Sequence, residues 1–182
     1  MRLFPYRVDN YFAFFSAILG FVGTLVIAMD RFGPIHHSID RLGRWQNIST
    51  GLRTLDTLQT KLHDGQMVGL LQPNSPGFNE LAHIISLNRP DFREEDIGTI
   101  VKNAPVSVGG VDLRILHIAR RNTNSATPIG VEYMLYDWVK DYRQKCFLKY
   151  GLSLIGLGFM LSIFSRIRRY PQLSIHNRDH QH

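Results

Sequence analysis

The chain has 182 residues and a formal net charge of +6. This length accommodates one ordinary domain with two membrane segments, or one larger soluble domain. Residues 30–145 carry fourteen Lys or Arg against thirteen Asp or Glu. The excess positive charge therefore lies mostly outside this region, which argues against nucleic-acid binding, because nucleic-acid-binding domains carry a basic patch or stripe. The single cysteine, Cys146, excludes an intramolecular disulfide, so the central region must be held together by its own core.

Two apolar segments of nineteen residues each lie near the ends of the chain, at residues 11–29 and 146–164. A helix needs about 20 apolar residues to cross the hydrocarbon core of a bilayer. The first segment carries no charge, and the second carries only Lys149 near its start, where a long side chain can reach the headgroups. We therefore predict an α+β membrane protein in which two transmembrane helices flank one extramembrane domain, residues 30–145. The alternatives are helices buried in a soluble core and, for residues 11–29, a cleaved signal peptide.

The short flanks predict the orientation of these segments. Residues 1–10 contain Arg2 and Arg7, and the His-containing tail, residues 165–182, begins with a basic cluster of Arg166, Arg168 and Arg169. Positive charge next to a membrane segment favours the cytoplasmic side. We expect both termini in the cytoplasm, the central domain outside it, the protein in the plasma (inner) membrane, and the three arginines at the membrane surface. Arginines also follow the first segment, at positions 31, 41 and 44, so the inverted topology stays open.

After the first apolar segment, apolar residues at three- and four-residue steps predict a helix over residues 39–63. Residues 66–71 form a short apolar run that is typical of a buried strand. Ser75 followed by Pro76 predicts a helix start, with Ser75 as N-cap, and this helix should stop before Pro90. Asp91 with Glu94 resembles a capping box and predicts a further helix that includes Ile97, Ile100 and Val101.

The following region is predicted to be mostly β. Gly109-Gly110 is a two-residue hairpin signal between Val106 and a strand over residues 111–119. A polar loop over residues 120–128 separates this strand from an alternating strand over residues 129–135, and a short helix over residues 137–145 leads to the second apolar segment. Helices and strands are segregated along the chain, which predicts an α+β domain with a small antiparallel meander of three strands.

The sequence contains no nucleophile elbow, phosphate-binding loop or metal-binding spacing, so we assign no catalytic residue, cofactor or metal. Tail histidines His176, His180 and His182 are best explained as part of a polar tail. The most suggestive polar group accompanies the predicted strands and comprises Asp112, Arg114, Arg120, Arg121 and Glu132. Arg114, Arg120, Arg121 and Glu132 form our candidate patch for a ligand or partner. The alternative is a set of cross-strand ion pairs on a solvated face.

Small residues recur at four-residue spacing in both apolar segments, as in Ser16-Gly20-Thr24 and Gly158-Ser162. Such spacing lets membrane helices approach closely, so we expect the segments to pair with each other or with a partner. The layout of two segments around an outer domain resembles the input half of bacterial membrane sensors. We therefore predict a non-enzymatic accessory or sensory subunit whose partners are the lipid bilayer and another membrane protein or a second copy. A membrane-tethered enzyme and a cytoplasmic adaptor domain are the alternatives.

Overall fold

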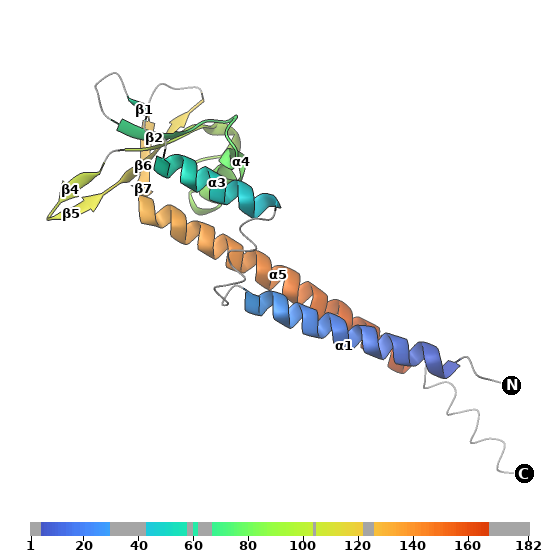
Figure 1. The fold of residues 1–182 in the computed structure, drawn as a ribbon. Helices are drawn as coiled ribbons and strands as arrows, with labels where there is room; N and C mark the ends of the chain where they lie inside the picture. The colour runs from blue at the N-terminus through green and yellow to red at the C-terminus, as the bar shows by residue number, and fades with distance from the viewer. Residues whose placement is uncertain are drawn as a thin grey trace, which may run out of the picture. The chain divides into compact units, whose positions relative to one another are not determined.

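The computed structural model describes residues 5–29, 43–57, 60–61, 67–103, 105–121 and 126–167. The elements, in chain order, are α1 (Pro5–Met29), α3 (Gly43–Thr57), β1 (Thr60–Lys61), β2 (Met67–Leu71), α4 (Phe78–Asn88), the 3-10 helix η1 (Glu94–Asp96), β3 (Ile97–Lys102), β4 (Val106–Val108), β5 (Val111–Leu113), β6 (Ile115–Arg120), β7 (Ala126–Val131) and α5 (Glu132–Ile167) (Figure 1). Helices combined with antiparallel strands confirm the predicted α+β class. The chain divides into two compact units, one of Pro34–Arg143 and one of Met1–Gly33 with Gln144–His182.

The main sheet has five antiparallel strands in the order β1-β2-β3-β6-β7, rather than the three-stranded meander that we predicted. The pairing aligns Leu71 with Ile100 and Ile118 in one row across β2, β3 and β6. Two residues along, Gly69, Lys102, Leu116 and Gly130 form a second row. Because side chains alternate along a strand, both rows lie on the same face of the sheet.

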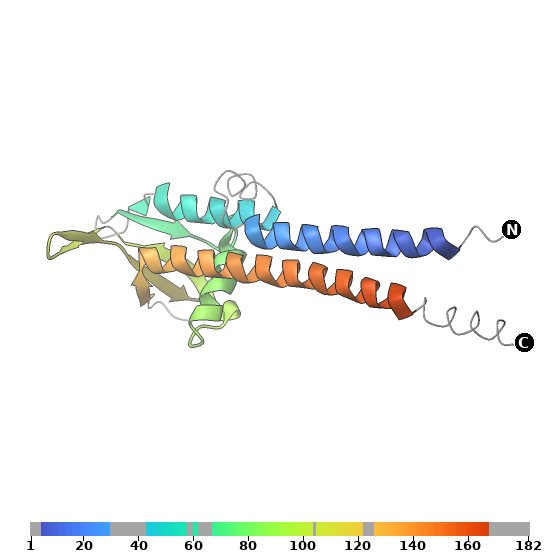
Figure 2. The ribbon, with the colours of Figure 1, turned by 90° about the horizontal axis from the view of Figure 1, so that it is seen from below.

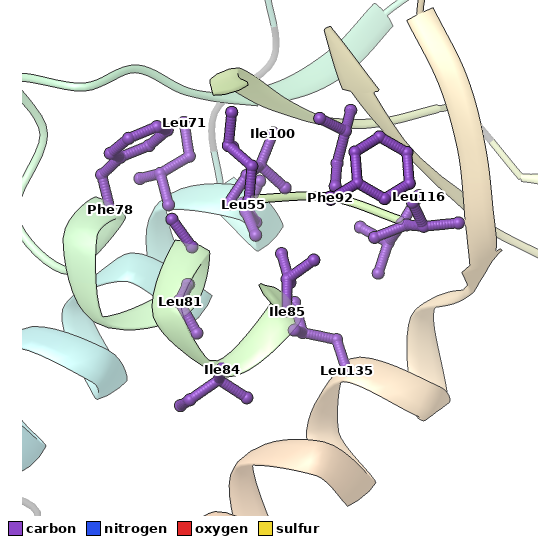
Figure 3. Packing of buried hydrophobic residues seen from close by; sticks show 14 of the residues in the cluster. Leu55, Leu71, Phe78, Leu81, Ile84, Ile85, Phe92, Ile100, Leu116 and Leu135 are labelled. Atoms are coloured by element: carbon purple, nitrogen blue, oxygen red, sulfur yellow. The ribbon is translucent and has the colours of Figure 1, made fainter. Parts of the chain in front are cut away.

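That face is covered by α3, α4 and the first turns of α5 (Figure 3). The side chains that meet there are almost fully buried and include Leu55, Leu71, Phe78, Leu81, Ile85, Phe92, Ile100, Leu116 and Leu135. Burying such a side chain stabilises a fold by about 1.5–3 kcal/mol. This core provides the stability that the lone cysteine cannot provide through a disulfide.

The helix that we predicted to open at Asp91 and to include Ile97, Ile100 and Val101 is wrong. The chain makes only the single turn η1 and then enters β3, which pairs with β2 on one side and with β6 on the other. A register shift between Ile97 and Thr99 places both Ile97 and Ile100 in the core. A bulge of this kind interrupts the two-residue period, and the resulting three-residue spacing imitates a helix in the sequence.

The predicted start of α4 is also wrong, because the helix begins at Phe78 after Gly77. Gly77 has a positive φ of 85°, and a Cβ atom there would lie 2.1 Å from the carbonyl oxygen of Asn47. The carbonyl of Ser75 accepts the backbone N–H of Phe78 at 3.1 Å. Residues 75–77 therefore form a tight turn against α3, and only glycine fits its last position. The helix does end before Pro90, as predicted.

Other local predictions are confirmed in part. The strand expected at residues 66–71 is β2. The helix expected at residues 39–63 contains α3, but residues 60–61 form β1 and its first residues lie outside the described residues. The hairpin is confirmed by the β4–β5 pairing, with φ of 61° at Gly109 and 81° at Gly110.

The strand predicted over residues 111–119 is divided at Arg114 into β5 and β6. The strand predicted over residues 129–135 is shifted, because β7 begins at Ala126 and α5 already starts at Glu132. Its alternating apolar residues continue into a helix, where Leu135 and Val139 point into the core. The short helix expected at residues 137–145 is therefore part of a single helix of 36 residues (Figures 1 and 2).

In the other unit, α1 packs against the second half of α5 through small residues. A Cβ atom on Gly23 would lie 2.6 Å from the carbonyl oxygen of Gly151, and one on Gly158 would lie 2.8 Å from that of Ser16. The Ser16 hydroxyl donates a hydrogen bond to the carbonyl of Gly158 at 2.6 Å. Both α1 and α5 are long and apolar enough to cross a membrane by length and composition.

Candidate functional site

Lys102, at the end of β3, lies on the helix-covered face of the sheet and is only 5% exposed. Its neighbours in the same row include Gly69 and Gly130, which have no side chains. A Cβ atom on Gly69 would lie 2.1 Å from the carbonyl oxygen of Leu55, so α3 passes directly over this part of β2. The row therefore leaves room for one long side chain beneath the helices, and a charged one must find partners there.

The partners of Lys102 come from two helices. Its Nζ donates to Oδ1 of Asp56, near the end of α3, and to Oε1 of Glu132 at 3.1 Å. Glu132 is the first residue of α5, where a carboxylate also interacts favourably with the helix dipole. One turn further, the hydroxyl of Tyr136 donates to Oδ2 of Asp56 at 2.8 Å. We call Asp56, Lys102, Glu132 and Tyr136 the Lys102 cluster.

The Lys102 cluster keeps Asp56 ionised. Burial alone raises the pKa of the Asp56 carboxyl, but the hydrogen bonds from Lys102 and Tyr136 outweigh burial and hold this pKa below its ordinary value. Arg114 lies 3.9 Å from the Glu132 carboxylate, so the two carboxylates face two cations. The arrangement links α3, β3 and α5 through side chains whose charges balance.

A pocket of about 280 Å³ opens beside this cluster, between α3 and the first part of α5. Asp56 and Tyr136 contribute to its wall. The remaining lining combines aromatic or aliphatic side chains with cations: Trp45, Ile48, Ser49, Leu52 and Arg53 from α3, and Val139, Lys140 and Arg143 from α5. Ile48 and Val139 also belong to the hydrophobic core, so the floor of the pocket is the outer side of that core.

The structure does not bring the predicted patch together as one site. Arg114 and Glu132 lie side by side, since the backbone N–H of Glu132 also donates to the carbonyl of Arg114 at 2.8 Å. Arg120 and Arg121 lie at the opposite end of β6, six residues further along the chain. At about 3.3 Å per residue this separates the two groups by about 20 Å.

The other two arginines of the predicted patch, Arg120 and Arg121, contact the segment that leads into β3. Arg120 stacks on the Phe92 ring at 5.0 Å and donates to the carbonyl of Asp91 at 3.3 Å. Arg121 donates to the carbonyl of Ile97 at 3.2 Å. Both therefore brace the turn that precedes β3. Asp112 lies on β5, opposite Ser107.

Of the predicted membrane-surface arginines, Arg166 lies exposed in the last turn of α5. Arg168 and Arg169 lie outside the described residues, as do the tail histidines.

Sequence reasoning missed Lys102, Asp56 and Tyr136. The available signal was a lysine directly after Ile100-Val101, in a strand whose other residues are mostly apolar. Among the residues that the structure describes, no group of three or more His, Cys, Asp or Glu is placed to hold a metal ion. Comparison with protein-family models, with curated proteins and with solved structures gives no match for this chain.

Proposed function

We propose that this chain is a two-span integral membrane protein, an accessory or sensory subunit whose extramembrane domain is a non-enzymatic binding module. The observation that carries the proposal is the continuity of α5. This helix begins at the sheet, contributes Leu135 and Val139 to the core of the domain, and continues without interruption to Ile167. One element thus belongs both to a binding domain and to an apolar segment.

The length of α5 supports a helix whose first part belongs to the extramembrane domain and whose second part spans the membrane. Its 36 residues extend about 54 Å, whereas a bilayer's hydrocarbon core is about 30 Å thick. The charged first part, up to Lys145, belongs outside such a core, while exposed apolar residues such as Leu157, Phe159 and Phe164 suit lipid. Glycine packing between α1 and α5 supports the insertion of both as a helical pair.

The binding role is supported by the pocket between α3 and α5. Among the described residues that line it, the one carboxylate, Asp56, is held by Lys102 and Tyr136 rather than presented as a proton acceptor. A ligand or partner at this position would touch α3 and α5 together. A change in how α3 packs on α5 would thereby reach the helix that we place in the membrane.

Membrane integration and orientation are tested together. The full chain should stay with membranes in alkaline carbonate and dissolve only in detergent. A reporter phosphatase inserted between Gly109 and Gly110, in an exposed turn with open space around both residues, should be active if the domain is extracytoplasmic. A fusion after His182 should be inactive.

Several outcomes would change the proposal. Release by carbonate would refute the two spans, and an active C-terminal fusion with an inactive turn fusion would establish the inverted topology. Changing Arg166, Arg168 and Arg169 to Glu should disturb the orientation, whereas Lys at all three should preserve it. A stoichiometric partner that co-purifies in mild detergent supports a subunit, whereas an activity of the chain alone would establish an enzyme.

A further inference from the structure

We infer that the pocket between α3 and α5 binds a small organic oxyanion, a carboxylate or phosphate carried on a compact apolar body. The inference rests on the proposed role of the domain as a binding module, and it names the class of ligand. It follows from the charge, the apolar lining and the size of the pocket.

The charge of the lining is unbalanced toward positive. Among the described residues, two exposed cations, Arg53 and Lys140, line the pocket together with one carboxylate, that of Asp56. Asp56 accepts hydrogen bonds from Lys102 and Tyr136, and the buried Lys102 already compensates its negative charge. Cations that converge on a concave surface raise the local concentration of anions.

The cations come from both helices that border the pocket. Arg53 lies on α3, where its guanidinium is 3.4 Å from the Ser49 hydroxyl. Lys140 and Arg143 are three residues apart on α5, a spacing that puts them on the same side of the helix. Arg53 and Lys140 are exposed, and neither has a carboxylate within ion-pair distance among the described residues. An oxyanion in the pocket would supply the missing counter-charge and would be held from two sides.

The apolar lining indicates that the anion has a hydrophobic body. Ile48 and Val139 form the floor, Leu52 is half-buried, and Trp45 and Tyr136 add aromatic surface. An inorganic anion would leave this surface uncovered. Ligand pockets usually enclose about 300–1,000 Å³, so a pocket of about 280 Å³ fits a single ring or a short chain.

Phenylphosphate is a suitable probe, because it combines one ring with an oxyanion. The chain has two tryptophans, and only Trp45 lines the pocket. In the full-length Trp138→Phe protein in uncharged detergent, Trp45 fluorescence should therefore report binding. We expect a Kd on the order of 0.1–1 mM for a ligand of this size. Benzyl alcohol and inorganic phosphate should each bind at least tenfold more weakly.

A matched pair of variants tests which cations are responsible. Arg53→Gln with Lys140→Gln should weaken phenylphosphate binding at least tenfold. Arg44→Gln with Lys145→Gln removes the same charge from the same two helices, outside the pocket lining, and should change Kd less than twofold. Unfolding midpoints of both variants show whether the fold is retained. The comparison of phenylphosphate with benzyl alcohol needs neither variant.

Equal binding of benzyl alcohol would overturn the anionic requirement, and equal binding of inorganic phosphate would overturn the apolar one. Equal losses in the two double variants would overturn the assignment to this pocket. A protein that resists carbonate extraction but binds no phenylphosphate refutes the ligand class and leaves the two-span proposal intact. A protein that carbonate releases but that binds phenylphosphate refutes the two-span proposal and leaves the ligand class intact.

Discussion

Replacing Lys102 by methionine should strongly destabilise the compact unit Pro34–Arg143. Methionine keeps the length and the apolar stem of lysine, but it leaves Asp56 and Glu132 as neighbouring carboxylates without their shared cation. Removing one partner of a fully buried pair costs about 3–5 kcal/mol. The Asp56 and Glu132 side chains are 39% and 25% exposed, so water screens part of this penalty, and we expect a loss of about 2–3 kcal/mol.

Thermal unfolding of the full chain in uncharged detergent at pH 7 measures this loss. Near-ultraviolet circular dichroism reports the packing of the aromatic side chains. For a domain of about 110 residues, a loss of about 2–3 kcal/mol lowers the midpoint by roughly 10 °C. Lys140→Met removes an exposed lysine and should change the stability by less than about 0.5 kcal/mol.

A triple variant, Lys102→Met with Asp56→Asn and Glu132→Gln, separates lost charge pairing from lost packing. It removes the two carboxylate charges that have lost Lys102, so it should regain most of the stability that Lys102→Met loses. If the single variant is as stable as the unmodified protein, or the triple variant is no more stable than the single one, the Lys102 cluster does not hold α3, β3 and α5 together as we argue.

Two further predictions concern the helix pair and pH. A Cβ atom on Gly151 would lie 2.7 Å from the carbonyl oxygen of Gly23, so Gly151→Leu should separate α1 from α5 and speed amide hydrogen exchange in both helices. Gly156→Leu, at a position with open space, should leave the exchange rates unchanged. Equal effects of the two variants would contradict the packing of α1 on α5. Burial lowers the pKa of His117, so the unfolded chain binds its proton more readily and stability should fall as pH drops below about 6.5. In His117→Gln, the melting midpoint should change less between pH 7 and pH 5 than in the unmodified protein. An equal pH dependence of the two midpoints would show that His117 does not cause the loss of stability.

Local sequence signals predicted the elements whose structure is determined locally. The apolar segments form helices, and Gly109-Gly110 forms the hairpin turn because two consecutive positive φ angles favour glycine. β3 was not predictable in this way. Its bulge places Ile97 and Ile100 on one face, and this three-residue spacing is also that of a helix. Only pairing with β2 and β6 decides between the two.

The candidate site depends even more on tertiary structure. Lys102 lies 46 residues from Asp56 and 30 from Glu132, and no local pattern relates these positions. They meet because the strand register places Lys102 between Gly69 and Leu116, directly under the helices. Of the predicted patch, Arg114 and Glu132 lie side by side because they flank the ends of the adjacent strands β6 and β7. Arg120 and Arg121 lie at the other end of β6, and the sequence alone did not show this separation because it does not give the strand boundaries.

Asp56 belongs both to the Lys102 cluster and to the wall of the pocket, so the stability of the domain and the binding of an oxyanion should be coupled. Without Lys102, the Asp56 carboxylate would repel an anion in the pocket. We therefore expect Lys102→Met to weaken phenylphosphate binding about tenfold, which corresponds to about 1.4 kcal/mol. Adding Asp56→Asn should restore most of the affinity. Both are measured by Trp45 fluorescence in the Trp138→Phe background, below the unfolding midpoint of each variant. If the double variant binds as weakly as Lys102→Met, the lysine supports the pocket by packing, and neutralisation of Asp56 is not what admits the anion.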